Sequence, residues 1–164
     1  MMSNTFKIKD VVAEDFVNYK LPSMFIITST CNWKCCHEGN FPESVCQNNS
    51  LVNKPTKEVS NKSLIDLYRS NPITKAVVIG GLEPFIQFEE VLNFINDFRN
   101  VSEDNIVIYT GYNKDEVLWA VNSFRVYSNI IIKFGRYIPN HKPHFDSVLG
   151  VNLISDNQYA ERIS

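Results

Sequence analysis

The four cysteines of the chain are the residues whose types and spacing most clearly indicate chemistry. Cys31 and Cys35 stand four residues apart directly after an apolar segment, and Cys36 and Cys46 follow them. Clustered thiols in a reducing compartment indicate a metal or redox site. If the chain folds Cys46 back, three thiolates can share one iron-sulfur cluster and leave one iron open to a small molecule. Such an open iron predicts catalysis more than electron storage.

Structural zinc is the alternative use of these thiols. Four thiols, or three thiols with His37, would satisfy a tetrahedral ion, but structural zinc usually takes two spaced pairs of ligands and only one such pair is present. Cys35 and Cys36 are adjacent, and successive side chains of an extended backbone diverge. We therefore expect Cys36 to be spare, packed or in a secondary role. The spacing alone leaves iron-sulfur and zinc binding open.

The order of apolar segments predicts the elements that position the cysteines. Apolar, β-branched runs predict strands at 24–30, 75–79, 105–109 and 129–134, and helices begin near 60, at 84 and at 114. This alternation predicts an α/β fold with right-handed crossovers and a mostly parallel sheet. The cluster loop, 31–55, is rich in Asn, Ser, Gly and Pro. Ligands of such sheets gather beyond the carboxyl ends of the strands.

Two further turns follow predicted strands. Gly80 and Gly81 would let a ligand approach the backbone closely, and Glu83 could take an ammonium group, but a strand-to-helix turn often contains glycine for steric reasons alone. Thr110 and Gly111 can equally form a tight exit from the next strand. Taken alone, both turns favour a structural role.

Composition and charge limit the class of protein. The 164 residues, 44% of them hydrophobic, suit one domain with one ordinary core. The net charge of −2 provides no global positive field for nucleic acid or an anionic membrane. The N-terminus lacks a signal peptide and no segment is long enough to span a membrane, so we expect a cytoplasmic protein. Lys133 and Arg136, with the aromatic residues around them, could form a small anion site near a strand end, but we favour an ordinary solvated rim.

In their order along the chain, these motifs resemble those of the activating protein of anaerobic ribonucleoside-triphosphate reductase, a short member of the radical S-adenosylmethionine superfamily. Cys31, Cys35 and the run Cys46-Gln47-Asn48 are similar to the Cys-x-x-x-Cys-x-x-Cys pattern of that family, with a longer second spacer. Three further segments of the family have similar counterparts in this chain. Its glycine turn is similar to residues 80–84, its Thr-Gly-Tyr segment to residues 110–112, and its Ser-Asn-Gln segment to residues 155–158.

The chain departs from the family pattern at three places. Glu38 stands where the third cysteine would fall in the strict spacing, so Cys46 must complete the set through a longer loop. Leu82 is inserted in the glycine turn. Phe134-Gly135-Arg136-Tyr137 resembles an Asp-Gly-Pro-Phe segment of the family but lacks its acid. The first difference concerns the third cluster ligand, and the last concerns the contacts with a partner or substrate.

The resemblance implies a single radical SAM-like domain over 1–164, a partial (βα) barrel with 1–20 as an N-terminal extension. Its implied cofactors are a 4Fe-4S cluster and S-adenosylmethionine, and it implies no catalytic residue beyond the cluster. The cluster would be held by Cys31, Cys35 and Cys46, with Cys36 as a possible substitute. S-adenosylmethionine would be bound by Gly80, Gly81, Glu83, Thr110 and Gly111.

The implied activity is that of an activase, an oxidoreductase that generates a 5′-deoxyadenosyl radical and installs a glycyl radical on anaerobic ribonucleotide reductase. That large reductase would be the protein partner, and flavodoxin or ferredoxin would be the electron donor. No nucleic-acid or membrane partner is implied. The alternatives are a radical S-adenosylmethionine enzyme acting on another small molecule or peptide, and a non-catalytic iron-sulfur or zinc binding module.

Overall fold

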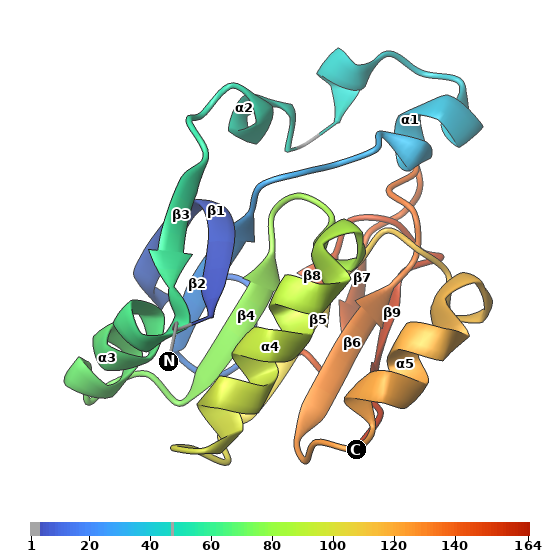
Figure 1. The fold of residues 1–164 in the computed structure, drawn as a ribbon. Helices are drawn as coiled ribbons and strands as arrows, with labels where there is room; N and C mark the ends of the chain where they lie inside the picture. Colours follow the sequence, from blue (N-terminus) through green and yellow to red (C-terminus); the bar gives the residue numbers. More distant parts are fainter. Residues whose placement is uncertain (1–3, 47) are drawn as a thin grey trace.

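A central β-sheet organises the computed structural model, which describes residues 4–46 and 48–164 (Figure 1). Within these residues the sheet has the strand order β3-β1-β2-β4-β5-β6-β9. Its four middle strands run parallel: β2 (Ser23–Thr28), β4 (Ala76–Gly80), β5 (Asn105–Tyr109) and β6 (Ile130–Phe134). The predicted α/β fold with a mostly parallel central sheet is confirmed, and the closure of this sheet into a partial barrel stays a prediction.

Helices in the crossovers cover one face of the sheet (Figure 1). These are α3 (Asn61–Ser70), α4 (Phe88–Arg99) and α5 (Leu118–Phe124), and the last two are preceded by the 3-10 turns η2 (Pro84–Gln87) and η3 (Lys114–Val117). Ser60 caps α3, since its Oγ accepts the backbone N–H of Ser63 at 3.1 Å. Apolar side chains from the helices and the strands meet in one continuous core, which fixes the strand ends relative to each other.

The opposite face carries a smaller apolar core. It is covered by the antiparallel ribbon of β7 (His144–Asp146) and β8 (Val151–Leu153), together with the buried side chains of Tyr19 and Leu149. The sequence had not predicted this ribbon, because its strands are too short to show a periodic pattern. Strand β8 of this second layer lines a cavity together with Tyr109 and Lys133.

The N-terminal extension is part of the sheet. β1 (Thr5–Asp15) pairs antiparallel with β2 on one side and with β3 (Lys57–Ser60) on the other, and Phe6 and Ile8 are buried in the core. At the other edge, β9 (Tyr159–Arg162) pairs antiparallel with β6. The first three residues of the predicted extension lie outside the described residues.

The cluster loop lies over the carboxyl ends of the parallel strands (Figure 1). It contains three short helical segments, α1 (Lys34–Gly39), η1 (Glu43–Val45) and α2 (Asn49–Val52), which the sequence pattern had not predicted. Gln47, part of the third cysteine motif, lies outside the described residues. Among the helices of the described segments, none combines the length and apolar character needed to cross a membrane.

Candidate functional site

Three of the cysteines line one cavity of about 300 Å³ at the carboxyl ends of the strands. Cys31 follows β2, Cys35 lies on α1 and Cys46 follows η1. The same cavity is lined by the predicted cofactor residues Gly81, Glu83, Thr110 and Gly111. The fold thus brings together predicted site residues that are up to 80 positions apart in the sequence. Its volume is at the lower end of the range of small-molecule sites.

Burial favours the protonated form of two of the thiols that line this cavity, Cys31 and Cys35. Burial, followed by the neighbouring Glu83 carboxylate and other thiols, raises the pKa of Cys31 to about 11, although the backbone N–H of Trp33 donates to its sulfur at 3.4 Å. Burial also raises the pKa of Cys35, against the opposing effects of the Tyr137 backbone N–H and of Lys133. A metal that binds here must therefore displace protons from these thiols.

The arrangement of the thiols fits a four-iron cluster. In residues 4–46 and 48–164, no three Cys, His, Asp or Glu side chains converge closely enough to hold a single metal ion. Cys31, Cys35 and Cys46 instead line one cavity, and a cubane can use such separate thiolates, because each one binds a different iron. Cys36 is only 1% exposed, does not line the cavity, and its thiol contacts that of Cys46.

Glu83 joins the turns around the cavity. Its carboxylate accepts hydrogen bonds from the backbone N–H of Phe85 at 2.9 Å, from Thr110 Oγ1 at 2.9 Å and from the backbone N–H of Gly111 at 2.8 Å. Burial raises the pKa of this carboxyl, while those three donors oppose the rise. A carboxylate offers about four lone-pair sites. The three donors therefore leave Glu83 room for one further donor from a ligand.

The glycines of the two turns have different structural roles. Gly81 lines the cavity with a φ of +87°, and a Cβ there would lie 2.6 Å from Ile27 Cγ2. At Gly111 a Cβ would lie 3.1 Å from Cys35 Sγ, so the absent side chain lets that sulfur approach. Gly80 lies on β4 outside the cavity lining, and its absent Cβ makes room for Tyr109 on the next strand.

Lys133 is a buried cation at the cavity, and its interpretation as part of a solvated rim is wrong. The residue is 7% exposed, and its Nζ donates to the carbonyl oxygens of Thr110 at 3.2 Å and Gly135 at 3.1 Å. Burial lowers its pKa to about 8, although Cys35 and Glu83 favour the charged form. The rim interpretation failed because Lys133 lies on β6, between β5 and β9, where its side chain is buried.

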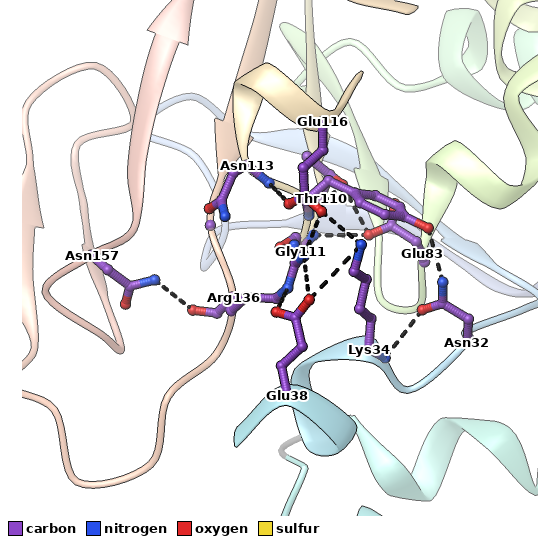
Figure 2. Close-up of polar contacts among 12 residues, drawn as sticks. Asn32, Lys34, Glu38, Glu83, Thr110, Gly111, Asn113, Glu116, Arg136 and Asn157 are labelled. Atoms are coloured by element: carbon purple, nitrogen blue, oxygen red, sulfur yellow. Dashed lines mark hydrogen bonds and ion pairs between the residues drawn. The ribbon is translucent and has the colours of Figure 1, made fainter. Parts of the chain in front are cut away.

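Arg136 is also buried, at 7% exposure, so the rim interpretation is wrong for it too. Its guanidinium pairs with Glu38 on α1 at 2.7 Å and with Glu116 on η3 at 2.7 Å (Figure 2). Lys34, also on α1, pairs with the same Glu116 oxygen at 2.6 Å. The Arg136 guanidinium, together with Lys34, lowers the pKa of Glu116 to about 2. Glu38 and Arg136, which lie in two of the segments where the chain departs from the family pattern, thus form an ion pair.

A second cavity of about 220 Å³ adjoins the first one, because Asn18, Tyr109, Lys133 and Gln158 line both. Sequence reasoning had assigned no binding role to these four residues. Two signals could have found some of them: Lys133 is the one charged residue of an otherwise apolar strand, and Gln158 belongs to the Ser-Asn-Gln-like segment. Asn18 and Tyr109 carry no comparable signal, since their placement depends on how the second layer packs.

A family model described as a 4Fe-4S single cluster domain matches residues 23–150. The match includes the cysteines, both turns that bear the predicted cofactor residues, and Lys133 and Arg136. Comparison with curated proteins and with solved structures found no match. The cavity lined by three thiols agrees with the family match, which covers well over half of the chain. The chain therefore belongs to the 4Fe-4S single cluster domain family.

Proposed function

We propose that this iron-sulfur protein is a radical S-adenosylmethionine activase whose target is a glycine of a large partner, the anaerobic ribonucleotide reductase. One observation carries the proposal: Cys31, Cys35 and Cys46 line the same cavity as the glycine turn at 81–83 and the Thr110-Gly111 turn. A cluster held by three thiolates keeps one iron free for the amino and carboxylate groups of the nucleoside. The turns beside it supply a place for those groups.

The chain's own residues would bind and orient the nucleoside. Gly81 opens the backbone to close approach, and the remaining lone pair of Glu83 would accept a hydrogen bond from the methionine amino group. Lys133 provides positive charge for the methionine carboxylate from inside the cavity. Burial of these opposite charges away from water strengthens their attraction to the two ends of the ligand.

A cluster held by these cysteines would supply one-electron reduction, which would split S-adenosylmethionine into methionine and a 5′-deoxyadenosyl radical able to take a hydrogen atom from a partner glycine. Flavodoxin or ferredoxin would supply that electron. The chain's role in this step is to exclude water from the cavity and to position the nucleoside.

The first experiment is anaerobic quantitation of iron and sulfide in the reconstituted protein, with electron paramagnetic resonance of the reduced form with and without S-adenosylmethionine. We expect a four-iron signal that changes when the nucleoside is added, and 5′-deoxyadenosine as a product. A cluster signal that does not change when the nucleoside is added would favour a non-catalytic iron-sulfur module. Zinc in place of iron would contradict the cluster assignment as well.

The partner requires a separate experiment. The loaded protein, reductant and S-adenosylmethionine are incubated with anaerobic ribonucleotide reductase, and the glycyl radical is recorded by its resonance signal. We expect that signal only when all components are present, and retention of the reductase on the immobilised protein. Nucleoside cleavage without radical transfer would redirect the proposal to a small-molecule or peptide substrate.

A further inference from the structure

The contacts of Arg136 join the cysteine segment to the sheet. Its Nε and Nη2 donate to the two oxygens of Glu38 at 2.7 and 3.1 Å, its Nη2 donates to Glu116 at 2.7 Å, and its Nη1 donates to the carbonyl oxygen of Gly111 at 2.6 Å (Figure 2). The guanidinium also lies over the Tyr112 ring, 5.5 Å from its centroid. A two-oxygen fork of this kind fixes orientation as well as distance.

The helix that Arg136 contacts cannot be stable alone. α1 has six residues and its N-cap, Trp33, makes no side-chain capping hydrogen bond. Isolated helices of this length do not form in water, because nucleation is unfavourable. Tertiary contacts must therefore hold α1 in place, and the ion pairs of Lys34 and Glu38 hold its two ends. Cys35, one of the proposed cluster ligands, lies between those two residues.

We propose that Arg136 is a positioning residue for the cluster. Its side chain fixes α1 against the Thr110-Gly111 turn and thereby places the Cys35 sulfur before iron binds. This inference rests on the proposed assignment of Cys35 as a ligand. Glu38 stands three residues after Cys35, where a strict motif would have a third cysteine. In this chain an ion pair therefore anchors the segment that a cluster thiolate would otherwise anchor.

The test measures the alkylation rate of each thiol in the reduced, metal-free protein, resolved by mass spectrometry, for wild type and Arg136→Met. We expect Cys35 to react about tenfold faster in the variant, because release of α1 exposes it. Cys31 follows β2 and lies outside α1, so its rate should rise less than that of Cys35. Iron bound per chain after reconstitution should fall in the same variant.

Arg99→Met is the matched control. Arg99 also donates to several backbone carbonyl oxygens, those of Ser102, Asp104, Ser128 and Asn129, but at the opposite end of the strands from the cavity. We expect it to lower thermal stability without a selective change at Cys35. Arg136→Lys should restore part of the iron loading, since it keeps the charge and loses the fork.

Glu38→Gln keeps the test decisive if Arg136→Met does not fold, because the Glu38 side chain is 51% exposed and tolerates substitution. Glu38→Gln should also raise the alkylation rate of Cys35, and the double variant with Arg136→Met should react no faster than Arg136→Met alone. Unchanged Cys35 reactivity in both variants would overturn the inference, as would equal acceleration of all four thiols in Arg136→Met and Arg99→Met. Because alkylation needs no metal, failure of the wild type to bind a cluster would contradict the proposed function separately.

Discussion

The backbone N–H of Gly111 donates to Glu83 Oε1 at 2.8 Å, which joins the ends of two parallel strands across the floor of the cavity. The backbone N–H of Glu83 in turn donates to the carbonyl oxygen of Thr30, the residue before Cys31, at 2.8 Å. One residue therefore connects the first cysteine, the glycine turn and the Thr110-Gly111 turn. This connection explains why a buried carboxylate is tolerated there, since its hydrogen bonds offset its desolvation.

Glu83→Gln should lower the free energy of unfolding of the metal-free protein by about 1–3 kcal/mol. The amide nitrogen would face backbone N–H donors in place of an acceptor oxygen, and one buried donor would lose its partner. Urea unfolding under anaerobic, reducing conditions measures the change. The exposed Glu89→Gln is the control and should change the free energy by less than about 0.5 kcal/mol. Equal stability of both variants would contradict the hydrogen-bonding role of Glu83.

Gly111→Ala should reduce iron loading more than stability. Its backbone is in a region open to any residue, but the added Cβ would lie 3.1 Å from Cys35 Sγ, so the sulfur must shift. Gly81→Ala should instead reduce stability more than iron loading. We expect it to lower the free energy of unfolding by about 1–3 kcal/mol, because its φ is +87° and its Cβ would lie 2.6 Å from Ile27 Cγ2. Iron per chain and urea unfolding separate the two effects. Full iron loading of Gly111→Ala would argue against Cys35 as a ligand.

Cys46→Ala should abolish cluster assembly, whereas Cys36→Ala should keep most of it. Cys46 lines the cavity with the other two proposed ligands, and Cys36 is buried outside the lining. Loss of the buried Cys36 sulfur should still cost about 1 kcal/mol of stability through the space left behind. Iron and sulfide analysis after reconstitution gives the result. The opposite pattern would show that Cys36 completes the cluster.

Lys133→Met should stabilise the metal-free protein at pH 7 by about 1–2 kcal/mol and weaken S-adenosylmethionine binding about tenfold. Burial lowers the folded-state pKa of Lys133 from 10.5 to about 8, so the unfolded chain binds more protons between these values. The stability advantage of Lys133→Met over the wild type should therefore shrink from pH 8 to pH 10.5; the thiols, whose raised pKa values act in the opposite direction, are common to both proteins. Urea unfolding across this range and equilibrium binding of the nucleoside to the loaded protein are the measurements. A variant that is less stable at pH 7 would mean that the hydrogen bonds of Nζ outweigh the cost of its burial.

Acidification should remove the contribution of the Glu116 ion pairs to the free energy of unfolding. Its pKa is lowered by Arg136 from 4.5 to about 2, so its ion pairs stabilise the fold fully above pH 4.5 and are lost as the pH falls toward 2. Because the side chain is partly exposed, we expect only about 1 kcal/mol from this residue. Urea unfolding at pH 6 and pH 3 should show a smaller loss for Glu116→Gln than for wild type. Equal losses would mean that solvent screens the pair completely.

The sequence by itself determined the order of the parallel strands and helices, because apolar periodicity and capping are local properties. The predicted strand 105–109 coincides with β5, and the helix predicted to begin near 60 is α3, which Ser60 caps. The cysteine spacing likewise indicated an iron-sulfur site, and the family match agrees with it. Short helices in the cluster loop escaped prediction, since segments such as α1 are stabilised by distant partners.

Only the tertiary structure decided which side chains share the cavity. Lys133 and Arg136 were placed on the surface from their charge, but pairing of β6 within the sheet and packing of α1 bury both. The ion pair of Glu38 with Arg136 joins residues 98 positions apart, and no local pattern records such a contact. The physical reason is that local propensity acts over a few residues, whereas burial and charge pairing depend on which segments the completed sheet brings together.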